Sequence, residues 1–235
     1  MKKGMVFLLI CFMLVFAAAC GETETSQNAQ TGTSGEAAQA SAETEASQGE
    51  NSNALIAYFT YAENAELPDG VDASASASIQ VADGERTGNT GMVARMIQDA
   101  TGADLFSIRT EESYPDNYED TVDQGQEEQA ENARPRLTEQ IENPDQYDTV
   151  FLGFPNWWGD MPMAVYSFLE EYDLSGKTIV PFVTSGGSGF SGTVSEIETL
   201  EPDAEVQEGL SIGGSSVQDA RSDVESWLRE LGYME

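Results

Sequence analysis

Short apolar runs alternate with amphipathic stretches over residues 54–235. The runs are nearly continuous in apolar residues, a pattern typical of parallel strands that are buried on both faces. They lie at 54–60, 103–109, 149–152, 178–183 and, more weakly, at 206–212. Apolar residues at helical spacing separate them and predict a helix that opens at 87, followed by helices at 122–132, 162–172, 193–200 and 216–231.

This alternation predicts an α/β fold, in which a parallel sheet lies between two layers of helices. Five strands fit the doubly wound order 2-1-3-4-5, which makes the first, third and fourth strands neighbours. The carboxyl ends of these strands then meet at one edge of the sheet, where open α/β sheets bind their ligands. We therefore expect one domain over residues 54–235, with its ligand site at that edge.

The N-terminal segment has the pattern of an export signal rather than of a folded element. Lys2 and Lys3 precede an apolar run at 5–16, and three alanines then lead to Cys20. The run is shorter than the ~20 residues that a membrane span needs. The segment resembles a bacterial lipoprotein signal, which implies removal of residues 1–19 and a lipid on Cys20. An ordinary signal peptide with an incidental cysteine is the alternative.

Residues 21–53 contain no aromatic residue and no Val, Ile, Leu or Met. A segment of this composition cannot bury a core, and it is expected to be disordered. The chain thus divides into a signal at 1–19, a tether at 20–53 and a folded domain at 54–235.

Composition excludes several kinds of chemistry. The two cysteines are Cys11 and Cys20, and the sequence has no histidine. The domain therefore has no disulfide, no thiolate, no Ser-His-Asp triad and none of the common zinc ligand sets. The net charge of −32 becomes −34 when Lys2 and Lys3 leave with the signal. Such a charge repels nucleic acid and anionic lipid and favours a basic partner or a small ligand, or it only keeps an exported protein soluble.

Polar or aromatic loops follow the three strands that are predicted to be neighbours. The first contains Thr87-Gly88-Asn89-Thr90 at a helix start, where hydroxyls and backbone N–H groups suit a phosphate. It has no lysine of the nucleotide-binding type, which argues against ATP or GTP. The second carries Trp157 and Trp158, of which at most one is easily buried because adjacent residues at a strand end point in different directions. The third, 184–189, is rich in glycine and serine.

A phosphate at one end, a flat ring between loops and polar backbone at the far rim describe FMN. An indole offers the ring a stacking surface. The predicted FMN ligands all lie in these loops: Thr60, Thr87, Gly88, Asn89, Thr90, Pro155, Asn156, Trp157, Trp158, Gly159, Thr184, Ser185, Gly186, Gly187 and Ser188.

In this order, the motifs resemble the flavodoxin family, in particular flavodoxin-like proteins of anaerobic bacteria with a Trp-Trp-Gly loop. The resemblance covers essentially all of residues 54–235. It implies a flavodoxin-like three-layer sandwich with FMN as cofactor, Trp157 or Trp158 on the flavin and the Gly159-Asp160 peptide near its N5 atom. One departure is the insert at 62–86, since the phosphate loop of ordinary flavodoxins runs directly into the helix. The insert is either a flap beside the flavin or a surface excursion.

Three functions are compatible with such a site. One is a reductase that passes electrons through FMN to a quinone or another small acceptor, and another is an electron carrier to a protein partner. The third is a non-catalytic binding protein. No side chain is an obvious general acid or base, so the flavin would carry the chemistry. Other residues have two interpretations. Tyr114 and Tyr118 are packing residues or proton donors, Arg134 is solvated or recruits an anionic group near the flavin, and Phe190 belongs to the core or covers the other face of the ring. Lys177, in a turn, is expected to be structural.

Overall fold

The computed structural model describes residues 53–68, 78–82 and 84–235. Its central sheet is parallel and follows the order β4-β1-β5-β6, with two short strands beyond β6. The strands are β1 (Ala54–Tyr58), β4 (Asp104–Ser107), β5 (Thr149–Pro155), β6 (Thr178–Ser185), β7 (Glu205–Val206) and β8 (Leu210–Gly213). The strands follow the expected order 2-1-3-4-5, but the expected count of five is wrong, because two short strands, β7 and β8, stand in place of the fifth.

The division of the fifth strand has a local cause in β6. Ile179 pairs with Val206, and Phe182 pairs with Leu210, so three residues lie opposite two across the break. Pro181 lies in this gap, and it has no N–H group to donate to a neighbouring strand. The extra residue opposite β6 therefore interrupts the pairing at Pro181, which cannot donate a hydrogen bond to the neighbouring strand.

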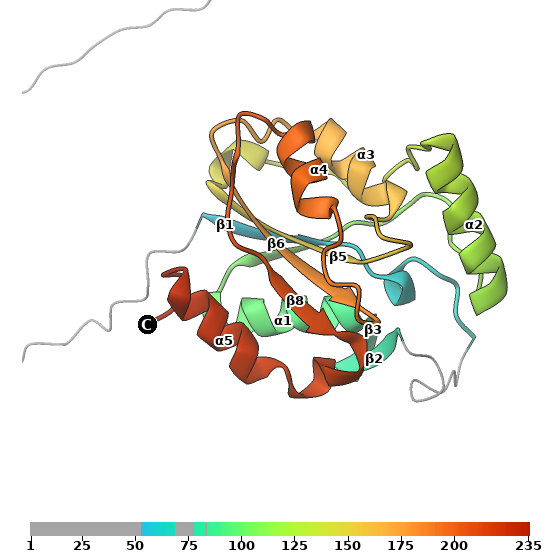
Figure 1. Ribbon diagram of the computed structural model, residues 1–235, viewed down its shortest axis with the longest axis horizontal. Helices are drawn as coiled ribbons and strands as arrows, with labels where there is room; N and C mark the ends of the chain where they lie inside the picture. Colours follow the sequence, from blue (N-terminus) through green and yellow to red (C-terminus); the bar gives the residue numbers. More distant parts are fainter. Residues whose placement is uncertain (1–52, 69–77, 83) are drawn as a thin grey trace, which may run out of the picture. The chain divides into compact units, whose positions relative to one another are not determined.

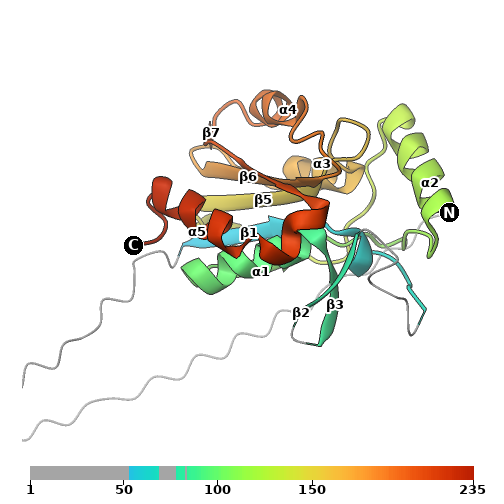
Figure 2. The same ribbon diagram turned by 60° about the horizontal axis from the view of Figure 1, so that its bottom comes forward.

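Helices cover both faces of the sheet (Figure 1). On one face lie α1 (Asn89–Thr101) and α5 (Arg221–Glu230), which follows a 3₁₀ turn at Gly214–Asp219. On the other face lie α3 (Met163–Glu171) and α4 (Thr193–Leu200). The remaining helix, α2 (Tyr118–Glu131), stands beyond the edge where the strands end (Figures 1 and 2).

The strands bury residues on both faces, which explains their continuous apolar runs. In β1, Ile56 and Tyr58 belong to the core under α1 and α5. Leu55 and Ala57 belong to the second core, under α3 and α4. All five residues of β1 are buried. The α/β sandwich expected from the sequence is thus the observed fold.

The insert after β1 forms a small unit of its own. A 3₁₀ turn at Tyr61–Glu63 is followed, beyond the undescribed residues 69–77, by β2 (Ile79–Ala82) and β3 (Glu85–Gly88). These two strands pair with each other in an antiparallel hairpin, separate from the main sheet. The expected helix start at Thr87 is wrong, because Thr87 and Gly88 end β3 and α1 begins at Asn89.

Two other helix boundaries differ from those expected. Helix α2 begins at Tyr118 rather than near 122, because the Asn117 side chain accepts a hydrogen bond from the Asp120 N–H and caps the helix. The single helix expected at 216–231 is a 3₁₀ turn followed by α5, which begins at Arg221. Among the residues that the structure describes, no helix is long and apolar enough to cross a membrane.

Candidate functional site

The three predicted loops meet at the carboxyl edge of the sheet. Thr90, in the first turn of α1, shares a 2.8 Å hydrogen bond with the hydroxyl of Thr184 at the end of β6. Asn156, after β5, donates its backbone N–H to the Thr184 carbonyl at 2.9 Å. Its side-chain amide donates to the Gly189 carbonyl at 2.8 Å. These contacts join the loops of β5 and β6 to the start of α1.

Thr60 and Gly88 come together although the insert separates them in sequence. A Cβ atom on Gly88 would lie only 1.9 Å from Thr60 Oγ1 and 2.9 Å from the Ser78 carbonyl. Only glycine permits this approach of the hairpin to the end of β1. Thr60 and the segment Thr87–Thr90 therefore lie together as they would in an uninterrupted phosphate loop. Thr60, Thr87 and Thr90 are buried there.

Glu63 is a residue of this region that the sequence did not reveal. Its side chain is only 6% exposed and lies 3.6 Å from Arg109. It accepts hydrogen bonds from the hydroxyls of Thr87 and Ser107, each at 2.6 Å, and from Tyr58 at 3.0 Å. Burial and the neighbouring Glu63 raise the pKa of Tyr58, so this phenol stays protonated as a donor.

The tryptophan loop is a tight two-residue turn. The N–H groups of Trp157 and Asp160 each donate to the carbonyl of the other, at 2.9 and 3.0 Å. Trp158 and Gly159 between them have φ values of 51° and 86°, as a type I′ turn requires. The Asp160 carboxylate holds the turn in place by accepting from the Met161 N–H and the Tyr166 hydroxyl, both at 2.8 Å.

The two tryptophans have different environments. Trp157 is partly buried and packs edge to face against Phe59 and Tyr114, each with ring centroids 5.5 Å apart. Trp158 is 43% exposed, one of three exposed large hydrophobic residues in the described part. Its indole lies against Gly125 of α2, where a Cβ atom would come within 2.8 Å of it. Trp158 is therefore the tryptophan with a surface to offer a ligand.

The glycine-rich loop combines a fixed base with an open tip. Ser185 accepts hydrogen bonds from the N–H groups of Gly187 and Gly189, at 3.2 and 3.0 Å, and so acts as a turn former. Gly186 and Gly187 are exposed, and a Cβ atom on either would meet nothing within 4 Å. Ser188 is exposed as well. The backbone of the tip is thus accessible to a ligand.

The residues with two interpretations can now be placed. Phe190 packs in the core against Phe154, and buried Tyr114 donates to Glu128. Arg134 pairs with Glu170 at 2.7 Å and stacks over the Tyr166 ring. Lys177 donates to two backbone carbonyls, and Tyr118 is 82% exposed. Packing or surface roles describe all five residues in this structure.

The basic side chains of the described part are all engaged. Six arginines pair with carboxylates: Arg95, Arg109, Arg134, Arg136, Arg221 and Arg229. Arg86 donates to the carbonyls of Leu67 and Pro68, and Lys177 to those of Pro144 and Tyr147. A phosphate at the start of α1 would therefore depend on hydroxyls, backbone N–H groups and the helix dipole.

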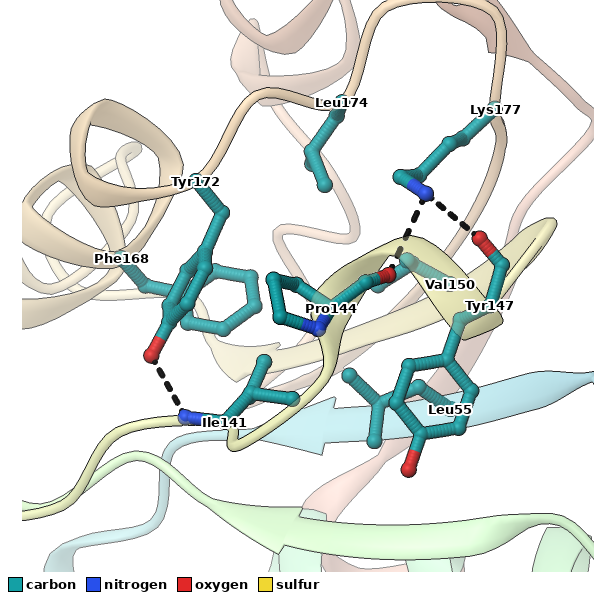
Figure 3. Close-up of a pocket in the computed structure, with 9 residues that line it drawn as sticks. All are labelled: Leu55, Ile141, Pro144, Tyr147, Val150, Phe168, Tyr172, Leu174 and Lys177. Atoms are coloured by element: carbon teal, nitrogen blue, oxygen red, sulfur yellow. Dashed lines mark hydrogen bonds between the residues drawn. The ribbon is translucent and has the colours of Figure 1, made fainter. Parts of the chain in front are cut away.

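Two pockets in the described part of the chain lie away from the three loops. One lies near the opposite ends of the strands and has a volume of about 10 Å³, roughly the space of one water molecule (Figure 3). Lys177 is one of the residues that line it, and it donates to the carbonyls of Pro144 and Tyr147 (Figure 3). The other is an open polar groove that includes Glu111, Arg136 and Glu171. Neither pocket contains a residue of the three loops.

The fold and the three loops define a doubly wound α/β protein with a ligand site at the carboxyl edge of its sheet. A family model described as flavodoxin matches residues 78–231, more than half of the chain, and the chain therefore belongs to the flavodoxin family. FMN, the cofactor predicted from the sequence, agrees with this membership.

Two solved structures with TM-scores above 0.5 share this fold. A protein described as a flavoprotein from Bacteroides uniformis is 25% identical with a TM-score of 0.58, over 77% of this chain and 99% of that one. Another, from Bacteroides eggerthii, is 26% identical with a TM-score of 0.56, over 77% and 98%. A flavoprotein in complex with FMN, from Lactobacillus acidophilus, is 19% identical with a TM-score of 0.49, over 73% and 99%. A search of curated proteins found no significant match.

The residues present fit FMN. The exposed indole of Trp158 provides a flat apolar surface, and the exposed backbone of Gly186 and Gly187 provides polar groups without side chains. The first turn of α1, beside Thr60, provides the positive end of a helix dipole. Among the predicted ligands, Thr87 donates its hydroxyl to Glu63, and Thr90 and Thr184 share one hydroxyl hydrogen bond.

Proposed function

We propose that this protein is an FMN-dependent reductase that is exported, anchored to the membrane by a lipid on Cys20, and passes electrons to a quinone or another small acceptor. The observation that supports the site most strongly is Trp158, an indole that is 43% exposed. Its turn follows Asn156, which donates to Gly189 of the open glycine-rich loop. An exposed large apolar ring at a ligand-binding edge is a natural stacking surface for a flavin.

The residues of the site bind and orient the cofactor and do not react themselves. When bound, FMN supplies one- and two-electron transfer. We assign the ring to Trp158 and to the backbone of Gly186–Ser188, and the phosphate to the loop of Thr60 and Asn89–Thr90. The N–H of the Gly159-Asp160 peptide is bonded to the Trp157 carbonyl, so that contact of this peptide with flavin N5 would use the Gly159 carbonyl.

A reductase is favoured over a carrier by the position of α2. This helix stands at the ligand edge of the sheet and contacts the tryptophan turn through Gly125 and through Gln129, whose amide donates to Asp160 at 3.2 Å. A wall of this kind holds a small acceptor near the ring and excludes water. The alternative is a carrier that exposes its ring edge to a protein partner, and the exposure of Trp158 supports it.

The two functions are separated by turnover. The full-length chain, purified in detergent with FMN, should quench flavin fluorescence on binding and should reduce quinones in the presence of NADH or NADPH. Flavin binding without turnover, but with rapid electron exchange to a basic redox protein, would favour the carrier. If ~100 µM FMN gives no measurable uptake, a level at which even ~10 µM affinity would show, the flavin site itself is refuted.

The lipid anchor has a separate test. Cys20 lies outside the residues that the structure describes, and the assignment depends on the signal-like sequence before it. Cys20→Ala should move the protein from the membrane fraction to the soluble extracytoplasmic fraction, because a lipid on this cysteine is the only anchor proposed. Cys11→Ala, inside the apolar run, is the matched control and should leave the protein in the membrane fraction.

A further inference from the structure

Glu63 brings a buried carboxylate to the loop that is assigned to the flavin phosphate. Three hydroxyl groups, from Tyr58, Thr87 and Ser107, donate to its two oxygens. Its side chain is 6% exposed, so water contributes little to its solvation. Hydrogen bonds from the protein thus take the place of water around this carboxylate.

This carboxylate lies against the first turn of α1. A Cβ atom on Gly91 would lie 2.0 Å from Thr87 Oγ1 and 3.1 Å from Glu63 Oε1. Glycine at position 91 therefore leaves room for the hydrogen-bonded side chains of Thr87 and Glu63. The N-terminal turn of a helix stabilises an anion, and Glu63 already benefits from this one. A phosphate bound at the same turn would be a second anion beside it.

Among the described residues, the side chains around this loop offer little positive charge to offset the two anions. A hydroxyl has one proton, and that of Thr87 is donated to Glu63 at 2.6 Å, so Thr87 cannot donate to a phosphate at the same time. Arg109 is the one basic side chain paired with Glu63 in the described part, and its side chain is 48% exposed. Solvent weakens the field of such a half-exposed cation.

We propose that Glu63 is a specificity-determining residue that reduces the preference of this site for a 5′-phosphate, so that the protein recognises flavins mainly by their ring and accepts riboflavin as well as FMN. This inference rests on the proposed flavin site. The two ligands differ only in a phosphate that carries about −1.5 to −2 at neutral pH, and Glu63 acts on that difference alone.

The test is the ratio of the dissociation constants of riboflavin and FMN, measured by fluorescence titration of the full-length chain in detergent at low ionic strength. We expect a ratio below about 10 for the wild type. Glu63→Gln should raise the ratio about 10-fold by tightening FMN alone, since a neutral amide no longer repels the phosphate. Arg109→Gln should lower the ratio about 3-fold, because Glu63 then loses its countercharge.

The matched control is Glu85→Gln, a carboxylate of the same insert that is 73% exposed and paired with Arg95. It should leave the ratio unchanged. A wild-type ratio far above 10, or a ratio that neither Glu63→Gln nor Arg109→Gln changes, would overturn the inference while the flavin site stands. Arg109→Gln decides the matter if Glu63→Gln does not fold. Absence of binding by either flavin would refute the flavin site and the inference together.

Discussion

The two ends of the candidate flavin site are built in different ways. At the ring end, a strained turn presents Trp158 to solvent, and the tip of the glycine-rich loop is open. At the phosphate end, Thr60, Thr87 and Thr90 are buried and Glu63 accepts three hydroxyl hydrogen bonds. One end has surface and backbone available for a ligand, and the other is already closed by internal contacts.

This difference shows where the binding free energy should come from. Stacking on an exposed aromatic ring is worth about 1–3 kcal/mol and needs no rearrangement of the protein. A phosphate has to displace or share donors that the protein now uses for itself, and a buried donor that loses its partner costs about 1–3 kcal/mol. The structure therefore predicts a site in which the ring contributes more than the phosphate.

The largest expected effect is on stability, and it concerns Trp157, the partly buried tryptophan of the turn. Trp157→Ala removes an indole that packs against Phe59 and Tyr114. A cavity of this size should cost about 3 kcal/mol of unfolding free energy, or roughly 6–12 °C in Tm for a domain of this length. Trp158→Ala should cost less than about 1 kcal/mol, because much of its surface is already exposed. If thermal unfolding showed the same decrease in Tm for both variants, Trp157 and Trp158 would not differ as a packing residue and a ligand surface.

The second prediction concerns the ligand surface itself. Trp158→Ala should weaken flavin binding about 30-fold, equivalent to about 2 kcal/mol, by removing the stacking surface. FMN and riboflavin should lose the same factor, since the phosphate does not take part in this contact. Trp158→Phe should recover most of the affinity. A loss confined to FMN, measured in the same fluorescence titration, would place Trp158 at the phosphate end instead.

Much of this arrangement could be predicted from the sequence. The strands were recognisable because both faces of the sheet are buried, which makes β1, β5 and β6 continuously apolar. The loops that meet at the site could be predicted as well, because the strand order makes these three strands neighbours and brings their carboxyl ends to one edge of the sheet. That only one of two adjacent tryptophans is easily buried followed from the alternation of side chains at a strand end.

The parts that sequence reasoning missed depend on contacts between distant segments. Glu63 becomes a hub only when Thr87 and Ser107, which are 24 and 44 residues away, fold around it. Gly125 gave one signal, a glycine inside a helix, which costs about 1 kcal/mol and suggests a packing reason. The start of α2 was missed because its first residues are polar or exposed, and only the Asn117 cap marks it.

The third prediction concerns Gly125, which links α2 to the ring end. Gly125→Ala places a Cβ atom within 2.8 Å of the Trp158 indole, so the indole must shift. We expect flavin affinity to fall about 10-fold, or about 1.4 kcal/mol, while the helix itself gains up to about 1 kcal/mol in propensity. Tryptophan fluorescence and flavin titration would report the shift. Gln126→Ala, on the exposed face of the same helix, is the control and should change neither.

The smallest expected effect is on the pH dependence of stability. It concerns Glu201, which follows α4 and lies outside the three loops of the site. Burial, with a smaller contribution from the charge of Asp173, raises the pKa of Glu201 to about 7. The unfolded chain should titrate this carboxyl near its ordinary value of about 4.3. The folded state thus binds this proton more tightly, and its stabilising effect is complete below pH 4 and is lost as the pH rises to 7.

Glu201→Gln should therefore be more stable than the wild type at pH 8 and nearly equal to it at pH 4. The difference at pH 8 should be no more than about 1 kcal/mol, because solvent screens a partly exposed carboxyl. Urea unfolding at the two pH values measures it. The ratio of riboflavin to FMN affinity should not change in this variant, because Glu201 lies at the end of α4 and not in the three loops. If the ratio changed in Glu201→Gln, a carboxyl outside the three loops would affect it, and a change in Glu63→Gln could not be assigned to the phosphate end alone.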